Sequence, residues 1–248
     1  MLSSTIIEKL EKIVGKGSLE ARLDGVFVSP EDAAKASEVI RSANEHKLKV
    51  LPLGSGSLLD SSKLSSENLI ILKTGRLNQL KKVVSEDLYV ILEPGFPLKD
   101  LNQRLEEFNL FYPLAGPKSV GTIGGSVAAN LKGKSGDKSI QTKEYVLALE
   151  LINPQGQIMH VGAKTFKSVT GYDLPRLYVG SWGTLGFITE ISLRLVPIKK
   201  RKYYPVFVPD PFPRNKNRYL KDIKSSISSR IKTALDPQQI FVDIASIP

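Results

Sequence analysis

The sequence predicts an α+β fold of two lobes followed by a short tail. Helical and extended patterns alternate through the first lobe, and a segment rich in glycine and small residues follows Pro113. Farther on, Ile191, Leu193 and Leu195 alternate with polar residues, which indicates a half-buried strand. A chain of 248 residues can bury a substantial core. We place the lobes at about 1–95 and 96–197, and a connector with one helix at 198–248.

Helix and strand signals define the elements of the first lobe. MLSSTIIEKLEKIVGKG predicts a short amphipathic helix whose internal charges do not fit a secretory signal. The segment from Ser29 to Leu48 predicts a second helix, with Ser29 as N-cap, Pro30 at the first helical position and Asp32 as the capping-box acid. FV, KVLPL, NLIIL and LYVILEPG predict strands. FPLKDLNQRLEEFN predicts a third helix with an apolar side of Leu98, Leu101, Leu105 and Phe108.

The second lobe begins with a loop and continues with strands. LAGPKSVGTIGGSVAANLKGKSGDK is expected to be a loop with one short helical turn, and EYVLALELINPQGQIMHVG predicts a hairpin that turns at Asn153–Gly156. Asp173 is the predicted N-cap of LPRLYV, and Tyr172 is expected to pack between the lobes. YLKDIKSSISSRIKTAL predicts a last helix.

Composition excludes several classes of protein. The absence of cysteine excludes disulfides, thiolate catalysis and iron–sulfur clusters within this chain. With no cysteine, a cytoplasmic location is the default expectation. No apolar run is long enough to cross a bilayer, so no transmembrane helix is expected. The net charge of +10 would suit nucleic acid, but the lysines are dispersed. The one dense basic run, KKRKYY at Lys199–Tyr204, carries no nucleic-acid motif, and we interpret it as a solvated surface facing an acidic partner or an anionic cofactor.

Three glycine-rich loops are candidate ligand sites: PLGSGSLL, GTIGGSVAAN and the glycines at 180, 183 and 186. Glycine lets successive backbone N–H groups approach a pyrophosphate, although any one of these loops alone also fits a tight turn. PLGSGSLL lacks the third glycine and the following helix of a dinucleotide-binding fingerprint. AANLKGKS matches a loose phosphate-binding loop, but Gly136 and Asp137 would break the required helix, so we interpret it as a chance match that an ATP-binding assay would test.

The loops gain meaning from their order. PLGSGS, EPG, TIGGSVAAN and GYDLPRLYVGSWGTLGFITEISLRLVP together resemble the FAD-binding domain of the vanillyl-alcohol oxidase / p-cresol methylhydroxylase (PCMH-type) family, and within it the FAD-binding subunits of the glycolate oxidase and D-lactate dehydrogenase type. The resemblance covers Val26–Pro197, and RIKTALDPQQIF is similar to the segment that closes such chains. It implies a two-lobed FAD-binding domain over 1–197, with an extended FAD between the lobes.

The resemblance also implies which residues bind the cofactor. The first loop would bind the pyrophosphate, the second would line the flavin and its ribityl chain, and the third would contact the cofactor from the other side. These residues are, in chain order, Gly54, Ser55, Gly56 and Ser57, then Pro117, Ser119, Thr122, Gly124, Gly125 and Ala128, and then Gly183, Gly186 and Ile188. Non-covalent FAD is expected because neither histidine nor cysteine occurs in these loops. No metal site is expected.

The sequence departs from the family pattern in three places. A Tyr-Gly pair usual in the family is replaced by Ser139 and Ile140. Trp182 stands where close relatives carry an acid or a small residue, and we interpret it as a core residue. About thirty residues, 198–229, occupy the place of the substrate-binding cap of larger relatives, so the cap is predicted to be absent or vestigial.

No residue is assigned a catalytic role. The family's catalytic histidines have no counterpart here, and we interpret His46 and His160 as structural. The resemblance implies an FAD-binding subunit of a 2-hydroxy-acid oxidoreductase, of the glycolate or D-lactate type. A larger flavin subunit and an iron–sulfur subunit would be its partners, with peripheral attachment to the inner membrane through them. The alternative is a non-catalytic assembly subunit that keeps the fold without FAD.

Overall fold

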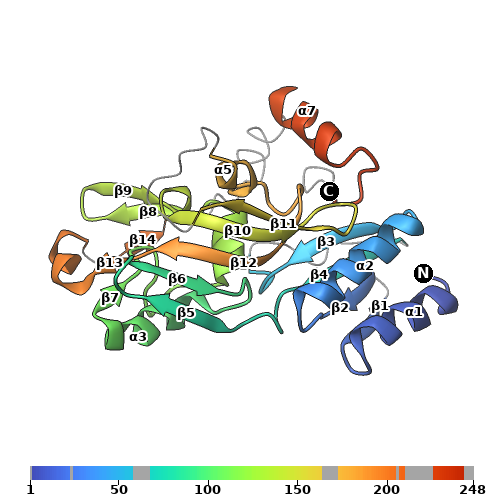
Figure 1. Cartoon of the computed structure of the whole chain (residues 1–248), viewed down its shortest axis with the longest axis horizontal. Helices are drawn as coiled ribbons and strands as arrows, with labels where there is room; N and C mark the ends of the chain where they lie inside the picture. Colours follow the sequence, from blue (N-terminus) through green and yellow to red (C-terminus); the bar gives the residue numbers. More distant parts are fainter. Residues whose placement is uncertain are drawn as a thin grey trace.

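Two sheets organise the computed structural model, which describes residues 2–22, 25–57, 68–163, 173–204, 207–209 and 226–242. The first is a four-stranded sheet of order β1-β2-β4-β3, in which β2, β4 and β3 run parallel. Two helices pack with it, and the buried faces of both join its core (Figure 1). These elements are α1 (Ser4–Val14), β1 (Leu19–Arg22), β2 (Gly25–Val28), α2 (Ala33–Glu45), β3 (Lys49–Leu53) and β4 (Leu69–Lys73).

The second sheet is antiparallel and has the order β11-β10-β12-β6-β5. Its β10–β11 hairpin turns at the predicted Asn153–Gly156. The predicted half-buried strand became β12, the central strand, and its polar Thr189 and Ser192 are 1% and 2% exposed because neighbours cover both faces. The strands are β5 (Leu80–Val84), β6 (Tyr89–Leu92), β10 (Val146–Ile152), β11 (Ile158–Gly162) and β12 (Phe187–Arg194).

The chain changes sheets earlier than the predicted division near residue 95. β5 and β6 pair into the second sheet, so the two sheets separate between Lys73 and Leu80. β6 is apolar and borders β12 directly, which gives its side chains a buried place in the second core. Proximity in sequence to the first lobe therefore does not decide the sheet that a strand joins.

Smaller elements complete the second lobe. The stretch expected to be a loop after Leu131 is instead a β8–β9 hairpin extended by β14, and Gly133 and Lys134 of the GKS motif lie in a strand. A phosphate-binding loop requires a helix there, so that motif is a chance match. The remaining elements are β7 (Leu110–Phe111), β8 (Lys132–Ser135), β9 (Lys138–Gln141), β13 (Val196–Pro197), β14 (Phe207–Pro209), α4 (Ile123–Ala128), α5 (Pro175–Tyr178), α7 (Ser226–Leu235), η4 (Thr142–Glu144) and η5 (Ile198–Tyr203).

Two helix starts differ from the prediction. Asp32, not Ser29, is the N-cap of α2, and its Oδ1 accepts a hydrogen bond from the Lys35 N–H at 2.7 Å. Its extended backbone leaves the preceding Ser29-Pro30 outside the helix. Asp173 does not cap α5 with its side chain; its carboxylate pairs with Arg176 at 2.6 Å, and Leu174 occupies the N-cap position. The predicted packing of Tyr172 lies outside the described residues.

The third predicted helix is broken into η2 (Leu98–Asp100), α3 (Leu101–Leu105) and η3 (Glu106–Phe108). Asn109 ends it in the left-handed conformation. Phe108 is 37% exposed, while the other three predicted apolar residues are buried. The last predicted helix is α7, whose first predicted turns, at 219–225, lie outside the described residues.

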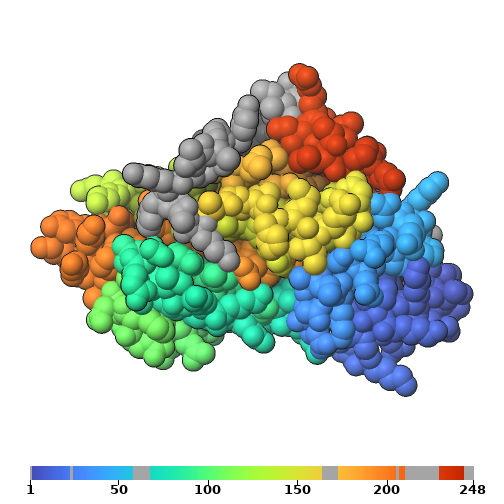
Figure 2. All heavy atoms as spheres, in the orientation of Figure 1, coloured from blue at the N-terminus to red at the C-terminus, as the bar shows by residue number. Residues whose placement is uncertain are grey.

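The two lobes are packed together, and the C-terminal segment adds to the first. The turn of the β10–β11 hairpin contacts α2, where Asn44 Nδ2 donates to the Pro154 carbonyl at 2.8 Å (Figure 2, yellow against blue). Phe241 forms a parallel bridge with Val50 and is 1% exposed in the core of the first sheet. Residues 198–225 separate β13 from α7, an interval too short for an independent cap domain.

Candidate functional site

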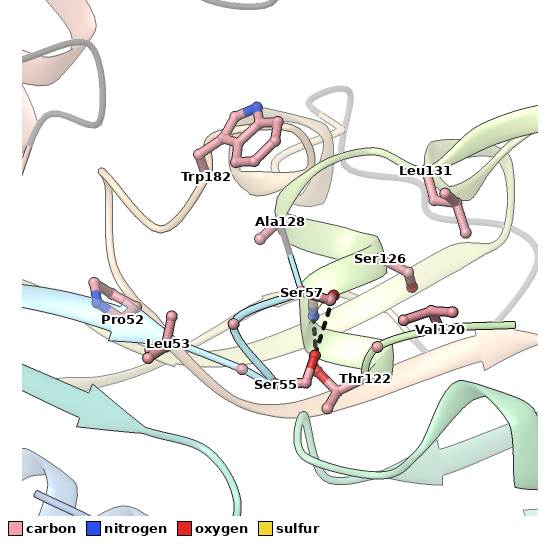
Figure 3. Close-up of a pocket in the computed structure, with 14 residues that line it drawn as sticks. Pro52, Leu53, Ser55, Ser57, Val120, Thr122, Ser126, Ala128, Leu131 and Trp182 are labelled. Carbon is pink, nitrogen blue, oxygen red and sulfur yellow. Dashed lines mark hydrogen bonds between the residues drawn. The ribbon is translucent and has the colours of Figure 1, made fainter. Parts of the chain in front are cut away.

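A groove formed by two adjoining hollows lies where the three glycine-rich loops meet (Figure 3 shows the larger hollow). The hollows hold about 640 Å³ and 390 Å³ of empty space. They have a common wall, formed by Pro52, Leu53, Gly54, Gly125, Ala128 and Trp182. None of the residues that line either hollow is charged, so backbone dipoles and hydroxyl groups set the polarity of the groove.

The strand order explains why the loops meet. The first loop, residues 54–57, leaves the carboxyl end of β3. The second precedes and includes α4, and the third leads into the central strand β12. Phe187, at the start of β12, is buried in the core of the first sheet, which brings the third loop against the first. The groove is therefore built by elements of both lobes.

The first two loops touch through glycines. A Cβ at Gly54 would lie 2.8 Å from Thr122 Oγ1, and one at Gly121 would lie 3.2 Å from Ser57 Oγ. Gly121 also has a φ of +93°, a conformation that residues with a side chain rarely adopt. These glycines thus serve the close packing of one loop on the other, in addition to any role toward a ligand.

The first amides of α4 are already used inside the protein. The N–H groups of Ile123 and Gly124 donate to the carbonyls of Phe96 and Pro94 at 2.9 and 2.7 Å, and Gly125 N–H donates to Thr122 Oγ1 at 3.2 Å. A Cβ at Gly124 would lie 2.6 Å from Pro94 Cβ, so a side chain there is excluded by the protein itself. This helix start cannot offer its amides to an anion.

The amides of the first loop are in the opposite state. No described residue accepts a hydrogen bond from the backbone N–H groups of residues 54–57 outside the strand ladders. Gly56 is left-handed, with a φ of +75°, and Ser55 Oγ donates to Ser57 Oγ at 3.2 Å (Figure 3). Successive N–H groups around a left-handed residue form a concave site for an oxyanion. Among the described residues, this loop is therefore the candidate phosphate site of the groove.

The third loop is anchored to the end of α4. Gly180 N–H donates to the Val127 carbonyl at 3.0 Å and Trp182 N–H to the Ala128 carbonyl at 2.9 Å. Gly183, with a φ of +77°, packs on Pro52, where a Cβ would lie 3.0 Å from the ring. The loop therefore has a fixed position over the groove.

Most of the predicted site residues come together in this groove. All of them line one or both hollows except Pro117 and Ser119. Pro117 is exposed, and Ser119 Oγ accepts from Gly116 N–H at 3.0 Å within its own turn. The prediction omitted several apolar or hydroxyl residues of the walls, and five of these, Pro52, Leu53, Pro94, Ser126 and Phe187, lie inside the ordered family motifs, which could have marked them. The others are Thr74, Val120 and Leu131. The prediction also assigned Trp182 to the core, whereas Trp182 is partly exposed and lines both hollows.

Neither histidine belongs to the groove. His46 Nδ1 lies 2.8 Å from the Ser42 carbonyl at the end of α2, and His160 Nε2 lies 3.6 Å from a Glu150 carboxylate oxygen on the exposed side of the second sheet. Within the described ranges there is no cluster of acidic or histidine side chains that could hold a metal ion. None of the helices in those ranges has the length and apolar character needed to cross a bilayer.

Comparison with known proteins identifies the family. A model of the FAD binding domain family matches residues 25–162, more than half of the chain, so the chain belongs to this family. The protein is 36% identical to glycolate oxidase subunit GlcD of Bacillus subtilis over 71% of this chain and 37% of GlcD. It is 34% identical to the mitochondrial D-lactate dehydrogenase (cytochrome) of Arabidopsis thaliana over 73% of this chain and 32% of that protein.

A solved structure shares the fold. A solved structure of alkyldihydroxyacetonephosphate synthase matches with a TM-score of 0.65 at 16% identity, covering 79% of this chain and 42% of that one. The PCMH-type fold predicted from the ordered motifs is confirmed, and its relatives are oxidoreductases of the flavoprotein type. The chain spans about a third of the length of the two relatives named above.

The groove fits the cofactor of this family. FAD combines planar rings with a pyrophosphate, and the groove combines apolar walls with the amides of residues 54–57, which have no acceptor among the described residues outside the strand ladders. Gly125 and Ala128 present little or no side chain to both hollows, which leaves room for a ligand along α4.

Proposed function

We propose that this chain is the FAD-binding part of a 2-hydroxy-acid oxidoreductase of the glycolate or D-lactate type, with FAD held non-covalently across the groove. The observation that carries the proposal is the convergence of three loops, distant in sequence, on one groove with an uncharged lining, where the amides of residues 54–57 have no described acceptor outside the strand ladders. The names of the relatives supply the substrate class.

Different residues of the groove would bind different parts of the cofactor. The N–H groups of Gly54–Ser57 would bind the pyrophosphate, and Thr122, Gly125 and Ala128 would line the flavin side. Gly183, Gly186 and Ile188 would close the smaller hollow over the other end. We expect non-covalent attachment, which is supported by the lining of the two hollows, where neither histidine nor cysteine occurs. Pro117 and Ser119 would reach the cofactor only by a rearrangement of their turn.

When bound, the flavin supplies the redox chemistry, which is acceptance of a hydride from the α-carbon of the 2-hydroxy acid. The chain itself supplies position and shelter: the walls exclude water, and the loop amides orient the phosphates. The described groove contains no general base, so deprotonation of the substrate hydroxyl falls to residues beyond it. A larger flavin subunit would supply them.

Electrons would leave through an iron–sulfur subunit, since this chain has no cysteine to hold a cluster. We place the complex in the cytoplasm, attached to the inner membrane through its partners. The word subunit in the name of the Bacillus subtilis relative supports a multi-subunit assembly.

The test is the visible absorption spectrum of the purified chain after addition of FAD and gel filtration. A flavin spectrum that remains with the protein is expected, followed by bleaching with glycolate or D-lactate once the partner subunits are added. A chain that binds no flavin when FAD is supplied in excess would overturn the proposal. It would then be an assembly subunit, a role that the buried Ile140 favours because it fills the place of the family's glycine.

A further inference from the structure

Trp182 has a backbone conformation that is unusual for a bulky residue. Its φ is +57° and that of Gly183 is +77°, and Thr184 N–H donates to the Ser181 carbonyl at 3.0 Å across them. Two consecutive left-handed residues inside such a hydrogen bond are the pattern of a type I′ turn, which favours asparagine or glycine at both positions. A tryptophan there is strained.

The side chain of Trp182 lies in the wall of the groove. Trp182 belongs to none of the three clusters of buried apolar residues in the described ranges. Its side chain is partly exposed and lines both hollows of the groove. Strained residues persist where the surrounding structure holds them in place, and they gather at ligand sites.

The turn is fixed from several directions. Trp182 N–H donates to the Ala128 carbonyl at 2.9 Å, Ser181 Oγ donates to the Tyr178 carbonyl at 2.7 Å, and Gly183 packs on Pro52. Figure 3 shows the indole beside Ala128 on the side of the hollow away from the Ser55–Ser57 loop. The backbone of the turn is thus held in place, which sets where the indole leaves the wall that the two hollows have in common.

We propose that Trp182 is a cofactor-binding residue whose indole stacks on a planar ring of the flavin nucleotide. This inference rests on the proposed function. The isoalloxazine and the adenine of FAD are both flat aromatic rings on which an indole can stack. Stacking of a base on an aromatic side chain commonly strengthens binding by about tenfold or more. Tryptophan at this position would be a feature of this chain, retained in spite of its backbone strain.

The experiment compares the parent with Trp182→Asn and Trp182→Phe. Asparagine tolerates the left-handed conformation, so Trp182→Asn should raise the melting temperature of the FAD-free protein by about 3 °C while weakening FAD binding about tenfold. Trp182→Phe keeps an aromatic ring and the strain, so its affinity should stay within about threefold of the parent. A gain in stability joined to a loss of affinity distinguishes stacking from simple packing.

Two half-ligands identify the stacked ring. ADP carries the adenine and the pyrophosphate, and FMN carries the isoalloxazine. Trp182→Asn should weaken the binding of one of them and leave the other unchanged. Trp182 is the only tryptophan, so a change of its fluorescence on addition of ADP, which does not absorb the emission, reports contact with the adenine half.

The outcomes separate the two proposals. If the parent binds no FAD, the proposed function fails. If the parent binds FAD and Trp182→Asn binds it equally well, the stacking is overturned while the proposed function stands. If Trp182→Asn lowers the melting temperature and the affinity together, or weakens FAD without weakening either half-ligand, Trp182 is a packing residue and the inference is wrong.

Discussion

The first and second glycine-rich loops of the groove look alike in sequence, yet their backbone N–H groups differ in whether they have a hydrogen-bond acceptor among the described residues. In the second loop, the first amides of α4 donate to Pro94, Phe96 and Thr122. In the first loop, residues 54–57, no described residue outside the strand ladders accepts from the amides. Glycine is required at Gly124 of the second loop and at Gly54 of the first by contact with the protein, and at Gly56 of the first by a left-handed backbone.

The difference shows that a glycine-rich loop beside a ligand does not by itself provide an anion site. The segment Glu93–Gly95 explains why the second loop is closed. A Cβ at Gly95 would lie 2.1 Å from the Thr74 carbonyl oxygen, so this segment packs closely on the end of β4. In this position the carbonyl of Pro94 accepts a hydrogen bond from the Gly124 N–H. We therefore name the second loop the closed loop and residues 54–57 the open loop.

The largest effect is expected when each of two neighbouring glycines of the closed loop is replaced by alanine. Gly124→Ala would force a Cβ against Pro94, and we expect a loss of about 3 kcal/mol in the free energy of unfolding, or roughly 6–12 °C in melting temperature. At Gly125 the nearest atom to a Cβ is Thr122 Oγ1 at 3.4 Å, so Gly125→Ala should leave the FAD-free fold as stable as the parent or slightly more so.

FAD binding should respond differently from stability. Gly125 lines both hollows, so its new methyl group should weaken FAD binding about tenfold through loss of space in the groove. Thermal melts of the FAD-free variants and FAD titrations by absorbance measure the two effects. Equal melting temperatures for the two variants would show that the Pro94 contact does not define the closed loop.

The sequence predicted the regular elements better than the loops, for physical reasons. Apolar periodicity is local, so the helices α1 and α2 and the strands β3, β4, β6, β10 and β12 are visible in it. The β8–β9 hairpin is not, because its strands are short and polar and are completed by β14, where Phe207 packs on Gly133. Pairing across distant segments supplies what the local pattern lacks.

The site was predictable only through the ordered family motifs. These gave the glycines and small residues of the groove, but not the state of their amides, since Gly56 and Gly124 are indistinguishable in sequence. The left-handed backbone of Trp182 is also invisible in sequence. It depends on hydrogen bonds to Ala128 and Tyr178 that exist only after folding.

A second test concerns Lys232, which holds the third glycine-rich loop through the carbonyl of Thr184. Lys232 Nζ donates to the Thr184 carbonyl at 2.7 Å and the Phe241 carbonyl at 2.9 Å and pairs with Asp236, which is fully buried. Lys232→Met would leave this carboxylate without its cation. We expect a loss of about 2 kcal/mol in the free energy of unfolding, measured by urea denaturation.

The matched control is Arg230→Met, an exposed position on the same helix, which should change stability by less than about 0.5 kcal/mol. If Lys232 secures the third loop, its variant should also weaken FAD binding, since Thr184 follows Gly183 at the wall. A variant that loses stability but keeps full affinity would show that the loop is held by its contacts with α4 alone.

The open loop should be tolerant in stability and sensitive in binding. Gly56→Ala places a side chain in a left-handed residue where no described atom lies closer than 4.0 Å, so we expect the cost to be the conformational strain of about 1 kcal/mol. Movement of the amides should weaken ADP and FAD binding about equally, by about tenfold, because both carry the pyrophosphate. Gly75→Ala, at a position without positive φ and without a described atom within 4 Å of a Cβ, is the control for both measurements. An unchanged affinity for ADP would show that the open loop does not bind the pyrophosphate.

The smallest effect on stability is expected from replacing Lys81, a partly exposed residue that pairs with Glu93 beside the closed loop. Lys81 Nζ lies 3.5 Å from Glu93, the residue before Pro94, and 3.2 Å from Glu190. Burial lowers the pKa of Lys81, but the carboxylates of Glu190, Glu93 and Glu150 outweigh it, so the pKa is raised overall. Since Lys81 is more than a third exposed, Lys81→Met should cost only about 0.5 kcal/mol near pH 7.

The pH dependence gives this small effect a distinct signature. A raised lysine pKa in the folded state contributes stability that is fully present below the unfolded value, about 10.4, and is lost as the pH rises through the higher folded value. The parent and Lys81→Met should therefore differ at pH 7–9 and converge in alkaline solution. Lys82→Met, on the same strand and without an ion pair among the described residues, should match the parent throughout. A difference that persists at alkaline pH would mean that the lysine supports Glu93 and the closed loop by packing of its stem, since packing does not depend on charge.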